Sequence, residues 1–196
     1  MNPKVWLLVI TVLGLITVPS ASQKPVREST DETYWIEPPA DLRQMLRSAD
    51  AVFTGSVGSR KGRFVPGVGG TKRIITDYVF DVDEVFKSNG PVGVAPPNVR
   101  VIALGGQVDA GDHIERKHHK GWKELKHGRR FIVFVKWNAY FNGYVFQYGP
   151  NGILEEISGK TVAFASAGAP QALDGLEWSE TLVRLREASR QAGLNP

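Results

Sequence analysis

Residues 76–87 carry the strongest structural signal in the chain, an alternation of apolar and charged side chains. The apolar set faces one way and the charged set the other, namely Tyr78, Phe80, Val82 and Phe86 against Asp77, Asp81, Asp83 and Lys87. A period of two is typical of a β-strand with one face on a core and the other in water, as in antiparallel sheets. The pattern therefore predicts a mainly β fold.

Further segments along the chain have strand-like patterns. The run at 131–135 is continuously apolar, and Asn142-Gly143 after it predicts a hairpin turn. The basic, glycine-rich stretch 60–72 is expected to form a hairpin tip or loop. The expected strands besides 76–87 are 51–57, 99–104, 131–135, 144–148, 153–157 and 161–164.

Helical spacing occurs at the two ends of this strand region. Asp41 precedes a short apolar stripe that begins at Leu42, and a carboxylate there accepts free backbone N–H groups of a helix. Near the C-terminus, Asp174 and Glu177 have the spacing of a capping box, before an amphipathic helix that ends at Gly193. The sequence predicts a short N-terminal helix and a C-terminal amphipathic helix around the strands.

The N-terminus has the layout of an export signal. Lys4 precedes a 14-residue apolar run at 5–18, and small residues suited to cleavage follow. The run is shorter than the ~20 residues that span a bilayer as a helix. We expect cleavage near Ser22, a secreted or periplasmic protein and no transmembrane segment after cleavage; an uncleaved anchor is the alternative. The expected organisation is a signal peptide at 1–22, a flexible leader at 23–40 and a single domain at 41–193.

The chain contains no cysteine. Disulfides, cysteine-based zinc sites, a catalytic thiol and lipid modification of a cysteine are therefore excluded. The expected domain is large enough to be stabilised by its own apolar core.

Three segments, taken in order, form a recognisable pattern. They read SADAVFTGSV at 48–57, YVFDVDEVFK at 78–87 and LKHGRRFIVF at 125–134. Together they resemble netrin-like domains, the group that includes the tissue inhibitors of metalloproteinases. The chain is more similar still to Cys-free exported bacterial proteins of unknown function, whose glycine motifs match Gly105-Gly106 and the segment 149–154. The resemblance implies a five-stranded antiparallel OB-type barrel, and it carries over little about function.

One departure from that family limits what the resemblance implies. Metalloproteinase inhibitors of this fold use an N-terminal cysteine to reach the zinc of their target, and this chain has none. That mode of inhibition is not expected here.

Residues 113–130 concentrate positive charge, with seven Lys and Arg against two Glu. Such a patch attracts an acidic partner even though the net charge is only +4. We expect the partner to be a protein or an anionic polymer of the cell envelope, with the 60–72 loop as a second contributor; an ordinary solvated loop is the alternative. The export signal argues against nucleic acid. The candidate binding residues are Arg116, Lys117, Lys120, Trp122, Lys123, Lys126, Arg129 and Arg130.

All four histidines lie in the same segment, at His113, His118, His119 and His127. Neutral imidazole binds zinc, copper or nickel, so a metal site is one hypothesis. Adjacent histidines on an extended segment point to opposite faces, and no HExxH motif is present. A polar surface loop is the plainer interpretation.

No sequence motif indicates catalysis, since neither a nucleophile elbow nor P-loop spacing occurs. The sequence therefore favours a non-enzymatic binding module with no cofactor. An extracellular protease inhibitor is the alternative that the family resemblance implies. A metal-dependent enzyme using the four histidines is the weakest alternative.

Overall fold

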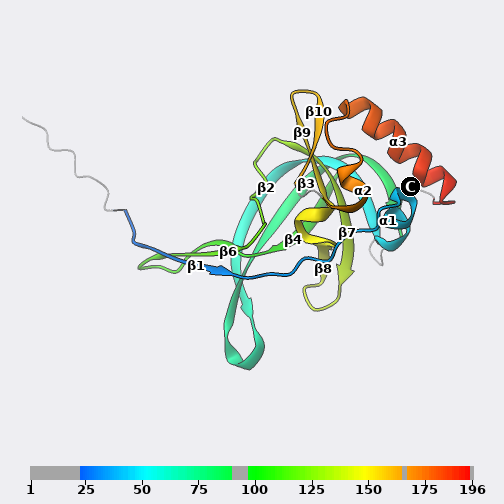
Figure 1. Ribbon diagram of the computed structural model, residues 1–196. Coiled ribbons are helices and arrows are strands. Elements are labelled where there is room, and N and C mark those ends of the chain that lie inside the picture. The colour runs from blue at the N-terminus through cyan, green and yellow to red at the C-terminus, as the bar shows by residue number, and fades with distance from the viewer. Residues whose placement is uncertain (1–22, 90–96, 165–166, 195–196) are drawn as a thin grey trace, which may run out of the picture.

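The computed structural model describes residues 23–89, 97–164 and 167–194 (Figure 1). The expected signal peptide lies outside these residues. Within them the fold is mainly β, as predicted, and no helix is long and apolar enough to cross a membrane.

The larger sheet has seven strands in the order β10-β9-β7-β2-β3-β4-β8. β8 also pairs with β7, so that β7, β2, β3, β4 and β8 form a closed ring. The sequence had suggested a wholly antiparallel ring. This prediction is wrong for one pair of strands, because β4 and β8 run parallel. The strand bounds are β2 Ala51–Pro66, β3 Lys72–Ser88, β4 Asn98–Leu104, β7 Arg130–Asn138, β8 Gly143–Phe146, β9 Ile153–Ile157 and β10 Lys160–Ala163.

The smaller sheet has three strands in the order β1-β6-β5. Their bounds are β1 Val26–Asp31, β5 Gly106–Asp109 and β6 Ile114–His119. β1 runs parallel to β6, where the sequence had suggested a flexible leader and a loop. The chain turns from β4 into β5 through Gly105 and Gly106, whose positive φ angles of 80° and 115° favour glycine.

Three α-helices accompany the sheets: α1 Leu42–Ser48, α2 Gly168–Gln171 and α3 Trp178–Gln191. Asp41 caps α1 as predicted, because its side chain accepts from the backbone N–H groups of Arg43 and Gln44. Asp174 does not cap α3; the helix begins after Glu177, and the Asp174 carboxylate instead accepts from the N–H of Ala163. Two short 3-10 turns, η1 Val68–Gly70 and η2 Gly149–Gly152, complete the described elements.

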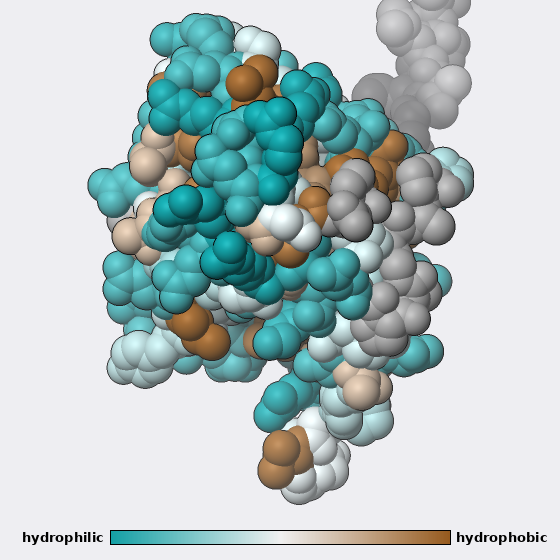
Figure 2. All heavy atoms as spheres, turned by 90° about the vertical axis from the view of Figure 1, so that its right-hand side faces the viewer, coloured by the Kyte–Doolittle hydropathy of each residue, from teal (hydrophilic) through white to brown (hydrophobic). Residues whose placement is uncertain are grey.

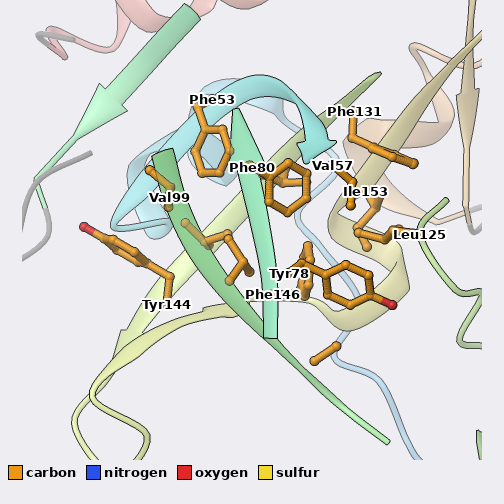
Figure 3. Close-up of a cluster of buried hydrophobic side chains, with 14 of the residues drawn as sticks. Phe53, Val57, Tyr78, Phe80, Val99, Leu125, Phe131, Tyr144, Phe146 and Ile153 are labelled. Atoms are coloured by element: carbon orange, nitrogen blue, oxygen red, sulfur yellow. The ribbon is translucent and has the colours of Figure 1, made fainter. Parts of the chain in front are cut away.

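The two largest apolar cores lie on the two faces of the large sheet, and a smaller cluster holds Val65, Ile75 and Ile102. The first fills the ring, where side chains such as Phe53, Phe80 and Phe146 point toward one another from different strands (Figure 3). The second lies between the outer face of the sheet and the three helices, with Met45, Phe134 and Leu185 among its members. The face that carries α3 is largely hydrophilic, with its hydrophobic residues in small separate groups (Figure 2).

Two irregularities near the end of β3 change which face its last residues occupy. Thr54 and Gly55 pair with Glu84 and Val82, and Val52 and Phe53 pair with Lys87 and Val85, so Asp83 and Phe86 are each an extra residue on β3. An extra residue reverses the alternation of faces. The extra residue at Asp83 places Phe86 in the second core, and the extra residue at Phe86 keeps Lys87 on the same face, where it is buried rather than solvated as the alternation had predicted.

The hairpin of β2 and β3 is longer than predicted and projects beyond the ring (Figure 1). Most of the expected loop 60–72 is paired strand, with the tip confined to 67–71. Gly62 on this hairpin faces β5, where an added Cβ would lie within 1.9 Å of the carbonyl oxygen of Gln107. Glycine thus allows β5 to pack closely against the hairpin, which brings the small sheet beside it.

Candidate binding site

The predicted binding residues are divided among three places in the fold. One group lies on β6 or directly after it, a second on the loop that leads to β7, and a third at the start of β7. In that order the groups are Arg116, Lys117, Lys120 and Trp122; Lys123 and Lys126; Arg129 and Arg130. The structure therefore does not gather all eight residues on one surface.

The cations on and after β6 face acidic side chains of the leader. Lys117 Nζ lies 2.6 Å from Asp31 Oδ1, and Lys120 Nζ lies 3.1 Å from Glu32 Oε2. Glu28 lies 2.8 Å from His118 Nε2 and 3.9 Å from Arg116 Nη1. Lys117 holds the pKa of the Asp31 carboxyl below its usual value. The leader therefore neutralises much of the charge that the sequence assigned to a partner.

Arg129 and Arg130 connect strands instead of forming a surface with β6. Arg129 Nε lies 3.1 Å from Glu155 on β9. Arg130 pairs with Asp83 on β3 and with Glu156 on β9, at 3.1 and 3.0 Å. These pairs link β7 to both sides of the sheet and leave the two arginines occupied within the protein.

Trp122 anchors the chain after β6 to the ring. Its ring centroid lies 5.2 Å from that of Phe146 and 6.1 Å from that of Trp35, which belongs to the leader. Trp35 Nε1 donates to the carbonyl oxygen of Lys120 at 2.7 Å. Trp122 therefore helps to position the leader, and the structure gives it this packing role beside any part in binding.

A cleft of about 970 Å³ lies between the β2–β3 hairpin and the small sheet. Four basic and two acidic side chains line it, together with His113 and His119: Lys72, Arg73, Arg116 and Lys117 against Asp31 and Glu115. Phe64, Ile74 and Leu104 add apolar surface. The arrangement is a basic groove with one leader carboxylate, that of Asp31, at its wall.

Lys72 and Arg73 supply the unpaired charge of this cleft. Within the part of the chain that the structure describes, neither forms an ion pair with a carboxylate, and Lys72 Nζ lies 5.5 Å from the ring centroid of Phe64. Lys123 and Lys126 likewise lack ion-pair partners there, although Lys123 Nζ lies 5.8 Å from the Phe164 ring centroid. Within the cleft, the cations of the hairpin are therefore free of carboxylate partners among the described residues, whereas Arg116 and Lys117 of β6 are paired with the leader.

The four histidines do not converge. His113 Nδ1 lies 2.5 Å from Asp112 Oδ1, His118 contacts Glu28, and His119 Nδ1 lies 2.7 Å from Thr33 Oγ1. Residues 23–89, 97–164 and 167–194 contain no group of three His, Asp or Glu side chains placed to hold a metal. Burial lowers the pKa of His119, with Asp31 acting in the opposite direction.

Sequence reasoning missed the acidic face of the leader. Glu28, Asp31 and Glu32 were expected to lie on a flexible segment. Their negative charge, opposite to that of the basic segment 113–130, was the one sequence feature that could have indicated the contact. Residues 60–72 were predicted as a hairpin tip or loop, whereas Lys72 and the next residue, Arg73, lie on paired strand.

Comparisons with known proteins find no match: no family model, no curated protein and no solved structure corresponds to this chain.

Proposed function

We propose that this protein is an exported, non-enzymatic binding module that holds an anionic partner in the basic cleft between the β2–β3 hairpin and β6. The observation that carries the proposal is the contact of Asp31 with Lys117 at 2.6 Å. An acidic side chain of the leader already lies at the wall of this cleft, which supports carboxylate-like groups as suitable ligands. The unpaired Lys72 and Arg73 offer further charge on the opposite wall.

We further propose that the ring is an OB-type barrel. The strands β2, β3, β4, β7 and β8 are the first to fifth strands of the ring in chain order. Around the ring they are neighbours in the order first, second, third, fifth, fourth, and the fourth strand pairs with the first to close it. An OB fold is a five-stranded Greek-key barrel in which the loops after the first and fourth strands flank the ligand. The equivalent loops here meet, because Tyr140 Oη donates to the carbonyl oxygen of Pro66 at 2.7 Å. The proposed cleft lies beside the first of these loops.

Retention of the full chain on an immobilised sulfated polysaccharide tests the proposed function. We expect Lys72→Glu to elute at lower salt than the unchanged protein, because it places a negative charge in the cleft. Asp31→Asn is expected to elute at higher salt, because the internal carboxylate no longer competes.

Lys160→Glu is the matched control. Lys160 is exposed on β10 and does not line the cleft, so this substitution makes the same change of charge away from the proposed site. Equal elution of Lys72→Glu and Lys160→Glu would place the binding surface elsewhere. The protease-inhibitor alternative remains a prediction from the family resemblance.

A further inference from the structure

The leader strand β1 is attached to β6 by polar contacts. Five of its six residues are exposed, and the sixth, Asp31, is only half-buried. Backbone bonds mark both ends of the pairing, from Ile114 N to the carbonyl oxygen of Pro25 at 2.9 Å and from Lys120 N to that of Asp31 at 3.1 Å. Exposed ion pairs add little stability and weaken as salt rises. β1 is therefore held to β6 by backbone hydrogen bonds and by ion pairs, and it buries little apolar surface.

The leader is anchored independently farther along the chain. Trp35 packs on Trp122, and Asn151 Nδ2 donates to the carbonyl oxygen of Ile36 at 3.2 Å. The carbonyl oxygen of Pro39 accepts from Ala169 N at 2.8 Å. Because these contacts lie after β1, the strand can leave β6 while the rest of the leader stays attached to the ring.

Departure of β1 would leave β6 as an edge strand with a basic face. An open edge presents unpaired N–H and C=O groups to which another strand can be added. In the register of the leader, Glu28 lies opposite Arg116 and Asp31 opposite His119, with Lys117 beside them. A backbone ladder of this kind fits a polypeptide and not a polysaccharide.

We propose that β6 is a docking edge for an acidic extended segment of a partner protein, which adds as a parallel strand in place of β1. This inference rests on the proposed function and deepens it, since it names the partner as a polypeptide and the leader as its internal competitor. The ligand recognised is a strand with carboxylates at the positions of Glu28, Asp31 and Glu32, paired along Ile114–His119.

The probe for this proposal is a fluorescent peptide with the sequence of residues 23–34, used with the full chain. A variant with Glu28, Asp31 and Glu32 all changed to Arg repels its own leader from β6. We expect this variant to bind the peptide at least about tenfold more tightly than the unchanged protein, whose leader competes at high effective concentration. A peptide with Gln, Asn and Gln at the three acidic positions is the matched control and should bind about tenfold more weakly. Equal affinity of the two proteins, or of the two peptides, overturns the proposal.

A reversible lock makes the test independent of how well that variant folds. Val26 and Ile114 are register neighbours in β1 and β6, and paired strands lie about 4.8 Å apart, within reach of a disulfide. The chain has no cysteine of its own, so Val26→Cys with Ile114→Cys introduces a single pair. We expect the oxidised form to lose peptide binding and the reduced form of the same molecule to regain the affinity of the unchanged protein. Peptide binding that is the same in both forms overturns the proposal.

Hydrogen exchange locates the bound peptide and separates this inference from the proposed function. In the charge-reversed variant, the amides of β6 that face the vacated edge, those of Ile114, Arg116, His118 and Lys120, should become protected when the acidic peptide binds. If the polysaccharide column retains the protein through Lys72 while the peptide protects none of these amides, strand addition is wrong and the anionic cleft stands. If neither ligand binds, both proposals fail.

Discussion

The Nζ atom of Lys87 lies 3.1 Å from the carbonyl oxygen of Leu46 in the last turn of α1. The same ammonium donates to the carbonyl oxygens of Arg47 and Ala49 at 2.7 and 2.5 Å, and only 4% of Lys87 is exposed. The last carbonyls of a helix lack partners within the helix and carry partial negative charge. A lysine of β3 therefore completes the end of α1 and joins that helix to the sheet.

Replacing this lysine should destabilise the protein. We expect Lys87→Met to lower the free energy of unfolding by about 2–3 kcal/mol, because buried carbonyl oxygens lose a charged donor. Lys136→Met, at an exposed position of β7, is the control and should change it by no more than about 0.5 kcal/mol. Urea unfolding of both variants measures the difference, and equal losses would show that the Lys87 contacts contribute nothing.

Gly149 allows the leader to dock. Its φ is 55°, and an added Cβ would lie 2.1 Å from the ring of Trp35. We expect Gly149→Ala to displace Trp35 and to increase hydrogen exchange in β1. Gly175→Ala is the control, since Gly175 has a similar φ of 79° and no atom within 4 Å of the added Cβ. Both variants incur a backbone penalty of about 1–2 kcal/mol. Only Gly149→Ala should also release the leader, and equal exchange in the two would contradict this role of Trp35.

Attachment of the leader should weaken in mild acid. Burial lowers the pKa of His119 below its usual 6.5, so the unfolded or detached state binds the proton more tightly than the folded state. The stability that depends on His119 is therefore present above the usual pKa and is lost as the pH falls below it. The lowered pKa of Asp31 adds a loss in the same direction only in stronger acid.

Protection factors of the β1 amides, measured between about pH 7.5 and about pH 5, check this prediction. They should fall with pH in the unchanged protein. In His119→Gln, the side chain does not titrate, and the dependence should largely disappear. A dependence that survives this substitution would assign it to another group.

The hydroxyl groups of Thr161 and Thr181 form a buried pair, 2.6 Å apart, that joins β10 to α3. Thr181→Val should lower the free energy of unfolding by about 1–3 kcal/mol, because the Thr161 hydroxyl is left buried without its partner. Changing both residues to Val removes both polar groups and should cost less than the single change. Thermal or urea unfolding of the two variants compares them, and a double variant less stable than the single one would refute this account.

Much of the fold was predictable because apolar periodicity reports burial directly. The large-sheet strands and both terminal helices were expected near their observed positions, with Asp41 at the correct cap. β6 was missed because its neighbours are the polar strands β1 and β5, so its sequence has no apolar face to reveal it. Asp174 was misassigned because its carboxylate bonds to a strand N–H that is distant in sequence.

The candidate site was predictable only in part, and for a related reason. The charge of Arg116, Lys117 and Lys120 is visible in the sequence, but its neutralisation by the leader is a contact between segments about ninety positions apart. The separation of Arg129 and Arg130 from that group follows from their place directly before and at the first residue of β7, where they pair with carboxylates of β3 and β9.

By itself the sequence determined the mainly β class, the cysteine-free core and the concentration of basic residues, because these depend on composition and on periods of a few residues. Only the tertiary structure decided that the strands close through β7 and β8, that Lys87 is buried, and that the leader covers β6. Each of these depends on which distant segments meet, and a one-residue bulge or a glycine such as Gly62 is enough to set that meeting. Local patterns specify elements, whereas long-range packing decides which charges remain free for a partner.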